Sequence, residues 1–290
     1  MNRNTRAYEV IADRIIAALD GGTVPWRKPW SLPAGIRPQS VAGHAYSGVN
    51  AVVLGLSGYC DPRWLTYRKA TELGGHVKRG EKGTPIVFVT PLTVERENED
   101  GQTEEKTIRF LRYYHVFNVE QCEGLPLPQV GTPEPFDPIA AAERIIANMP
   151  EPPPISHNGG NKAYYTPAAD SVHLPPRGAF SNAGEYYSTA FHELGHSTGH
   201  RNRLDRHGLE TGIAPFGSAV YSREELAAEF CAAFLCAQSG IQNTIDNSAA
   251  YIQGWAKAIN RDKRLVVIAA SQGQKAADYI LGRQADGQAA

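Results

Sequence analysis

The chain has 290 residues, of which 42% are hydrophobic and 20% are charged, so a packed core is expected and global disorder is excluded. No apolar run reaches the roughly 18 residues that cross a bilayer, which excludes a membrane-spanning helix. The net charge of −1 conceals a basic first part, residues 1–90, with twelve Lys and Arg against six Asp and Glu, and an acidic remainder with 17 against 24. The basic part predicts a module that binds a polyanion.

The beginning of the chain and its cysteines both favour a cytoplasmic protein. The first residues lead into an amphipathic pattern rather than the apolar core of an export signal. The four cysteines are scattered and form no CxxC pair. We therefore expect reduced thiols, and neither a disulfide framework nor a cysteine zinc site.

The first half of the chain predicts a mixture of helices and strands. Apolar residues recur at helical spacing over residues 8–19, and residues 64–73 predict a second, short helix. Residues 85–93 and 107–116 predict paired strands, with the acidic stretch 95–105 as the exposed tip of their hairpin.

A boundary follows, and the second half is predicted to be rich in helices. Nine of the 20 prolines fall between Pro126 and Pro154, around a helix predicted over residues 139–148. Residues 170–174 predict a strand. Four further helices are expected over residues 183–199, from Ser222 in the style of a capping box, and over residues 249–260 and 261–282. The fold class is therefore α+β, with two domains, residues 1–125 and 151–290, joined by a proline-rich linker and first helix over residues 126–150.

The strongest chemical signal is the HExxH run from His192 to His196, inside a predicted helix. Histidines four residues apart share one helix face, so both imidazoles can bind one metal ion. Glu193 points to the adjacent face, where it can act as general base and take a proton from the attacking water. The motif predicts a zinc metallopeptidase, although an idle site would contain the same residues.

A catalytic zinc ion of this type needs a third protein ligand, and the next helix offers two glutamates. We assign Glu225 as the third ligand and Glu229 as the group that accepts the ring N–H of a ligating histidine, with the reverse assignment left open. Apolar neighbours surround both carboxylates, and a buried carboxylate needs a partner. Four tyrosines are candidates to stabilise the oxyanion, and the sequence does not choose among Tyr164, Tyr165, Tyr187 and Tyr221.

These residues carry a resemblance to a known family. The chain resembles the ArdC-type antirestriction proteins of conjugative plasmids, in which a single-stranded-DNA-binding domain precedes a zincin-like metallopeptidase domain. In the first half the resemblance rests on four motifs: PWxxPW from Pro25, YSGVN from Tyr46, RWLTY from Arg63 and GGHVKRGEKG from Gly74. In the second half it rests on the HExxH run and on three further stretches: YYxP from Tyr164, DSVHLP from Asp170 and the REELxAE run from Arg223 to Glu229.

The resemblance implies that the first half binds single-stranded DNA through stacked bases and paired phosphates. The aromatic candidates for stacking are Trp26, Trp30, Tyr46, Trp64 and Tyr67. The basic candidates for phosphate contacts are Arg27, Lys28, Arg68, Lys69, Lys78, Arg79 and Lys82. Asn50, in the YSGVN motif, is included among the DNA-binding residues.

Two functions remain compatible with the sequence. In the first, the protein binds single-stranded DNA without sequence preference and carries an active peptidase with Zn²⁺, or another divalent cation such as Mn²⁺, which acts on host restriction or DNA-bound proteins and so protects incoming plasmid DNA. In the second, the protein only coats single-stranded DNA, and its metal site is structural. No membrane is expected as a partner.

Overall fold

The protein's structure, a computed structural model, places most of the chain. It describes residues 3–26, 32, 35–97, 103–128, 137–158, 160–206, 219–241 and 249–283. None of the helices in these ranges is long and apolar enough to cross a membrane.

The first half forms an α+β unit around a four-stranded sheet in the order β1-β2-β5-β4, beside a two-stranded sheet of β3 and β6. Its elements, in chain order, are α1 (Arg3–Asp20), β1 (Gln39–Ser40), α2 (Gly48–Gly55), β2 (Arg63–Leu65), α3 (Tyr67–Glu72), β3 (His76–Val77), β4 (Thr84–Glu97), β5 (Thr103–Asn118) and β6 (Cys122–Glu123). The predicted helix over residues 8–19 is confirmed within α1.

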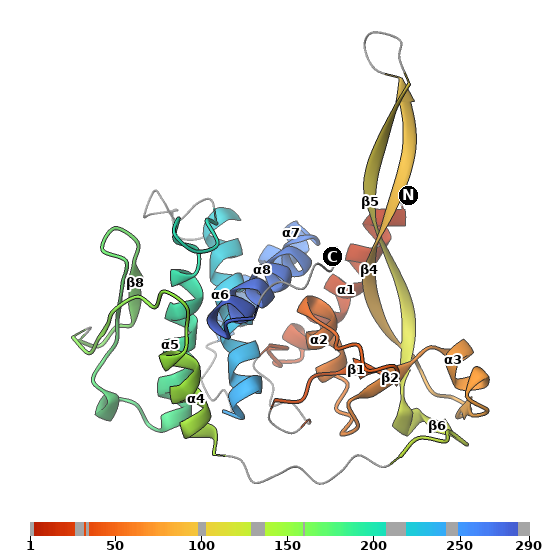
Figure 1. The fold of residues 1–290 in the computed structure, drawn as a ribbon, viewed down its shortest axis with the longest axis horizontal. Coiled ribbons are helices and arrows are strands. Elements are labelled where there is room, and N and C mark those ends of the chain that lie inside the picture. Colours follow the sequence, from red (N-terminus) through yellow and green to blue (C-terminus); the bar gives the residue numbers. More distant parts are fainter. Residues whose placement is uncertain are drawn as a thin grey trace.

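The predicted hairpin is confirmed as the longest feature of the sheet. β4 pairs antiparallel with β5 from Thr84 opposite Val116 to Glu97 opposite Thr103, and Figure 1 shows the pair extending away from the rest of the molecule. The two strands continue into the predicted tip, whose middle, residues 98–102, lies outside the described residues. The helix predicted to begin at Trp64 begins instead at Tyr67, because Trp64 pairs with β5 and Thr66 caps α3 by accepting a hydrogen bond from the Lys69 amide.

The second half is rich in helices, as predicted. Its elements are α4 (Pro138–Ala147), β7 (Ile155–Ser156), β8 (Tyr164–Thr166), β9 (Ser171–His173), α5 (Ala183–Ser197), α6 (Ala219–Ser239), α7 (Ala249–Arg261) and α8 (Leu265–Ile280). Three short strands form a sheet in the order β7-β9-β8. The helix start predicted at Ser222 is wrong, since α6 already includes Ala219. The α+β fold class is confirmed.

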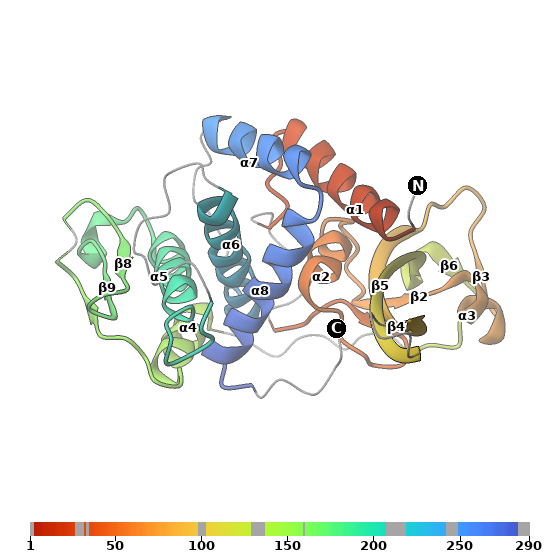
Figure 2. The same cartoon turned by 90° about the horizontal axis from the view of Figure 1, so that it is seen from above.

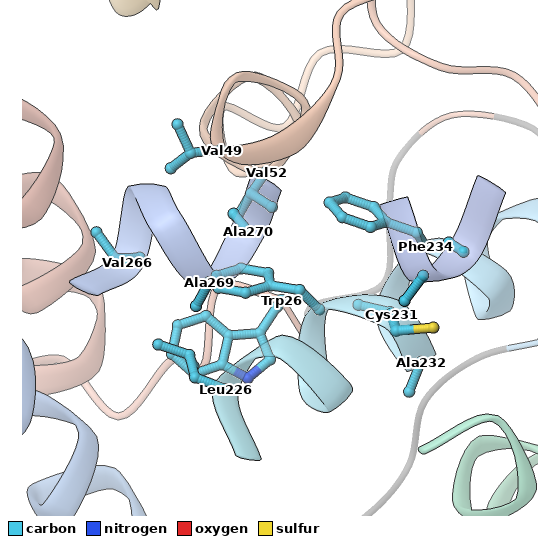
Figure 3. Packing of buried hydrophobic residues seen from close by; sticks show 14 of the residues in the cluster. Trp26, Val49, Val52, Leu226, Cys231, Ala232, Phe234, Val266, Ala269 and Ala270 are labelled. Carbon is cyan, nitrogen blue, oxygen red and sulfur yellow. The ribbon is translucent and has the colours of Figure 1, made fainter. Parts of the chain in front are cut away.

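One apolar core continues through both halves of the chain. α1 packs against α7, and α2 packs against α8, as Figure 2 shows. Trp26, which follows α1, is 1% exposed and lies among side chains of α6 and α8 (Figure 3). A Cβ atom on Gly273 would lie 2.5 Å from the Phe230 Cβ atom, so α8 can cross α6 this closely only because that residue is glycine. The two halves are therefore packed together rather than held only by a linker.

Candidate metal centre

Helix α5 presents the two histidines of the HExxH run. The Asn182 side chain caps its first turn by accepting a hydrogen bond from the Glu185 amide, and the Glu185 carboxylate accepts one from the Ser181 amide. One turn apart on the helix, His192 and His196 bring their Nε2 atoms to 3.1 Å from each other. Both ring nitrogens therefore point to one position, as two ligands of a single ion must.

Helix α6 adds a carboxylate to this position. Glu225 places one oxygen 3.6 Å from the His192 Nε2 atom and the other 3.5 Å from the His196 Nε2 atom. The three candidate ligand atoms all lie within 4.8 Å of one another. The close approach of the helices depends on Gly195, where a Cβ atom would lie 3.2 Å from the Ala228 Cα atom. This geometry supports Glu225 as the third ligand, and that assignment stays a prediction.

The outer nitrogens of the two histidines each face a further glutamate. Glu229, 5% exposed, has its Oε1 atom 3.8 Å from the His192 Nδ1 atom, where the sequence predicts an acceptor for a ring N–H. Glu224 has its Oε1 atom 3.5 Å from the His196 Nδ1 atom. A carboxylate on the outer nitrogen holds the imidazole in the tautomer that leaves Nε2 free for a metal. The sequence analysis missed Glu224.

A buried arginine holds Glu224 in this position. Arg206 donates two hydrogen bonds to the Glu224 carboxylate, of 3.1 and 2.6 Å, and others to the Thr198 hydroxyl and the Gly195 carbonyl oxygen at the end of α5. Burial by itself raises the pKa of Glu224, but the hydrogen bonds with His196 and Arg206 outweigh it and lower the pKa to about 2. The carboxylate is therefore ionised throughout the physiological range.

The charges around His192 suit a cation. Burial lowers the pKa of His192, but hydrogen bonding to Glu225 and the nearby charges of Glu229 and Glu193 outweigh it and raise the pKa to about 9. The field at the imidazole therefore favours positive charge. A donor set of two imidazole nitrogens and a carboxylate fits Zn²⁺ and also a harder divalent ion such as Mn²⁺. Glu193 is 7% exposed and belongs to the same helix turn.

Three of the four tyrosine candidates for oxyanion stabilisation contact other side chains, and the side chain of the fourth lies outside the described residues. The Tyr165 hydroxyl donates to the Asp170 carboxylate, and the Tyr187 hydroxyl donates to the Glu143 carboxylate. Tyr164 is exposed and stacks on His173, with ring centroids 4.7 Å apart. The Tyr221 side chain is outside the described residues. The oxyanion donor is not assigned to any of them.

Two tryptophans that the sequence predicts to stack on bases are buried. Trp26 lies 5.0 Å from Phe230 and 6.3 Å from Trp255, measured between ring centroids. Trp64 is 2% exposed and meets Tyr59 edge-on at 5.5 Å. For both residues the prediction is wrong, because other side chains already cover their ring faces.

The Asn50 side chain is hydrogen-bonded to the backbone of a neighbouring strand. Its amide group donates to the Val87 carbonyl oxygen at 2.7 Å, and its oxygen accepts from the Val87 amide at 2.8 Å. Both polar ends of the side chain therefore bind β4 and fasten α2 to the sheet. The prediction that Asn50 contacts DNA stays a prediction, beside this structural role.

The other predicted DNA contacts stay predictions. Tyr46 is half-buried, and burial together with the nearby Tyr114 raises its pKa to about 12. Tyr67 is exposed, and Lys78 is half-buried. Four exposed cations complete the described set, namely Arg68, Lys69, Arg79 and Lys82. Three predicted contacts lie outside the described residues, namely Arg27, Lys28 and Trp30.

Comparison with known proteins places both halves of the chain. Residues 5–117 match the family model for the N-terminal domain of anti-restriction factor ArdC, and residues 140–272 match a zincin-like metallopeptidase model. Two crystal structures of the antirestriction ArdC protein from plasmid R388, one metal-free and one Mn(II)-bound, are similar to this chain with a TM-score of 0.73 at 39% identity. They cover 96% and 97% of this chain, which in turn covers 98% and 99% of theirs. The chain belongs to the ArdC family of antirestriction proteins.

Curated relatives of this ArdC-family chain differ widely in length. The protein y4eC of Sinorhizobium fredii is 34% identical over 98% of this chain and 94% of its own length. Two Escherichia coli proteins named DNA primase TraC are 38% and 37% identical over 94% of this chain. This chain spans only 27% and 20% of the length of those two proteins.

Family membership agrees with the geometry of the candidate metal centre. A zincin-like domain matches the part of the chain that contains α5 and α6, and one structural neighbour is Mn(II)-bound. Together with the three converging ligand atoms, this indicates a divalent-metal site. The two family models leave residues 118–139 between them, which overlaps the predicted linker, while the domain boundaries themselves stay predictions.

Proposed function

We propose that this ArdC-family protein binds single-stranded DNA with residues of its first half, and that its metal centre hydrolyses peptide bonds of proteins met on that DNA. Its role is to protect incoming conjugative plasmid DNA from restriction. Family membership supports the antirestriction role. The basic charge of residues 1–90 supports the binding of a polyanion.

The observation that carries the peptidase proposal is the convergence of His192, His196 and Glu225 on one position, with Glu193 buried beside them. We propose Zn²⁺ as the ion in this site, with Mn²⁺ as the other candidate. When bound, the ion polarises the scissile carbonyl group and lowers the pKa of water.

The chain's own residues would supply the proton transfers and the orientation of the ligands. Glu193 takes a proton from the attacking water and returns it to the leaving amine. Glu229 and Glu224 hold the two imidazoles by their outer nitrogens, so that both inner nitrogens face the same position. None of these steps requires a contact with DNA.

The substitution Glu193→Gln tests the peptidase proposal, because it removes the base and preserves the size of the side chain. Hydrolysis of a fluorogenic unfolded-protein substrate should fall by at least about 100-fold, the low end for loss of a general base. Metal content by elemental analysis and affinity for a single-stranded oligonucleotide should be unchanged. An unchanged hydrolysis rate in Glu193→Gln would contradict the proposal.

Plasmid transfer into a restricting host then separates peptide hydrolysis from DNA coating. If Glu193→Gln loses protection while metal content and DNA affinity persist, hydrolysis is required for antirestriction. Full protection by the variant would mean that DNA binding alone suffices and that the peptidase acts in another role.

A further inference from the structure

A polar hollow lies where α3, β3 and β6 meet, and in Figure 2 helices α6, α8 and α2 lie between these elements and α5. Its lining residues come from the start of α3, from the stretch after β3 and from the end of β5. They include Tyr67, Phe117, Lys78, Arg79 and the backbone of Gly80. The hollow therefore combines aromatic and basic groups that are far apart in the sequence.

The aromatic part of the hollow is exposed yet fixed. Tyr67 is 61% exposed and is the first residue of α3, whose first turn is held by the Thr66 cap. Its ring centroid lies 6.4 Å from that of Phe117 with the ring planes at 67°, and the exposed fraction of 61% shows that much of the tyrosine side chain is open to solvent. A base can stack on the exposed part of this ring.

The basic part lies on a tight turn at the rim. Gly80 has a φ of +89° and closes the turn in which the Glu81 amide donates to the Lys78 carbonyl oxygen. Lys78 donates to the Glu120 carbonyl oxygen at 3.0 Å, and an ammonium group has two further N–H donors. Arg79 is exposed, and within the described residues its guanidinium group has no ion-pair partner.

Two carboxylates in the hollow limit how much negative charge it can accept. Glu81 accepts a hydrogen bond from the Gln121 side chain at 2.8 Å. Glu123 lies 3.5 Å from the His76 Nε2 atom. Both are held by neighbours, but their charges disfavour a second phosphate close to Lys78 and Arg79. The hollow therefore suits one phosphate group beside one base.

We propose that this hollow binds one nucleotide unit of single-stranded DNA, with the base stacked on Tyr67 and its phosphate between Lys78 and Arg79. The proposal rests on the proposed binding of single-stranded DNA and names the surface that performs it. It also separates the DNA from the metal centre, since α8 and α2 lie between α6 and the elements that line the hollow (Figure 2).

Titration of the full chain with a fluorescent single-stranded 20-mer, at several salt concentrations, tests the proposal. Tyr67→Ala should weaken binding about 5- to 150-fold, the range for loss of one stacked base, whereas Tyr67→Phe keeps the ring and should bind normally. Arg79→Ala should lower the slope of log affinity against log salt by about 0.7, the value for one phosphate contact with a single strand. Phe88→Ala is the matched control, because Phe88 is an exposed aromatic residue that packs on Tyr114 and does not line the hollow.

The outcomes distinguish this inference from the proposed function. If the unaltered chain fails to bind the 20-mer, the proposed DNA binding is wrong. If the chain binds but Tyr67→Ala and Arg79→Ala bind equally well, the DNA lies elsewhere and the inference is overturned. A deoxynucleoside monophosphate should compete only weakly, and competition as strong as that of the 20-mer would make the hollow a mononucleotide site and also overturn it.

Discussion

At the scale of single residues, three glutamates of α6 surround one pair of histidines from different sides. Glu225 faces both inner nitrogens, Glu229 faces the outer nitrogen of His192, and Glu224 faces that of His196. All three are glutamates of one helix, and the direction in which each side chain leaves that helix separates a ligand from a supporting residue.

This arrangement predicts a graded loss of metal from three variants. Glu225→Ala should abolish stable binding, since it removes a ligand. Glu229→Ala and Glu224→Ala should each weaken affinity by about 10- to 100-fold, the usual range for removal of an outer partner of a ligating histidine. Competition against a zinc-binding dye measures all three. Glu72→Ala, a carboxylate change on α3, is the control and should bind normally.

A different order of metal loss among these variants would change the roles assigned to the glutamates. If Glu229→Ala removes the ion and Glu225→Ala retains it, the ligand and supporting roles are reversed. If Glu224→Ala binds as tightly as the unaltered chain, its 3.5 Å approach to His196 contributes nothing to the orientation of that ring.

The helical spacing of the HExxH run predicts part of this site. The rest depends on tertiary contacts, which the sequence does not show. His192, Glu193 and His196 are recognisable because four residues make about one helical turn. Glu224 depends on Arg206, which is 18 positions earlier and reaches the carboxylate only in the folded chain. Trp26 misleads for the same reason: it stands next to basic residues in the sequence, but the structure places it in the core.

The burial of Trp26 predicts a stability effect and no direct DNA effect. Trp26→Ala should cost about 3–5 kcal/mol in the free energy of unfolding, the range for truncation of a large buried aromatic residue. Trp26→Phe should cost less, because a ring remains against Phe230 and Trp255. Urea unfolding measures both. A loss of DNA affinity in folded Trp26→Phe would restore the residue to the DNA-binding surface.

At the scale of elements, one ion pair connects the small sheet to the helix that carries the histidines. Arg203, whose side chain is 3% exposed, donates two hydrogen bonds to the Asp170 carboxylate just before β9 and another to the Ser197 carbonyl oxygen at the end of α5. Tyr165 of β8 donates to the same carboxylate. The network fixes where α5 ends relative to the sheet.

Asp170→Asn should therefore destabilise the fold by about 3 kcal/mol, the lower end for a broken buried pair, since Asp170 itself is 32% exposed. The matched control is Asp262→Asn, whose partner Arg264 is largely exposed, and it should cost about 0–1 kcal/mol. Thermal unfolding at neutral pH compares the two. Equal losses would mean that the Arg203 network contributes no more than a surface ion pair.

The Asp170–Arg203 ion pair also predicts how the loss of stability in Asp170→Asn depends on pH. Partial burial raises the pKa of Asp170, but hydrogen bonds from Arg203 and Tyr165 outweigh it, so the pKa lies below its ordinary value. A lowered folded-state pKa gives stability that is complete above about pH 4 and is lost as the pH falls through the folded value. The gap between the unaltered chain and Asp170→Asn should thus close at strongly acidic pH. If the difference in stability between the two proteins is constant down to pH 2, the charge of Asp170 is not its source.

The long elements were predictable and the short ones were not. The runs over residues 85–93 and 107–116 are rich in β-branched and aromatic residues and predict a hairpin, which the register of β4 and β5 confirms. β2 has three residues and forms by pairing with β5, through Trp64 and Leu65, and with β1 on its other side. Such a strand carries no periodic signal of its own, which is why the sequence predicts that Trp64 and Leu65 begin the helix that follows.

At the scale of the whole molecule, the charge division of the sequence does not correspond to a division of the core. α1 and α2 belong to the basic half, yet they pack against α7 and α8 of the acidic half. One large cluster of buried side chains has members from Ala7 in α1 to Ile280 in α8, beside a smaller cluster around Trp64 in the first half. Composition and motifs predict two functions from the sequence, whereas long-range packing has no local signal.

This continuous core predicts that the two halves unfold together. Chemical unfolding of the full chain should give one transition at the same midpoint whether it is followed by tryptophan fluorescence or by circular dichroism.

An isolated fragment of residues 1–125 would expose the faces of α1 and α2 that α7 and α8 cover, together with Trp26. Because uncovering large apolar side chains costs about 1.5–3 kcal/mol each, a few of them exceed the stability of a small domain. The fragment should therefore be unfolded or aggregated, and DNA binding should require the whole chain. Two separate transitions, or a folded fragment that binds the oligonucleotide as tightly as the full chain, would show instead that the first half is an independent module that only rests against the second.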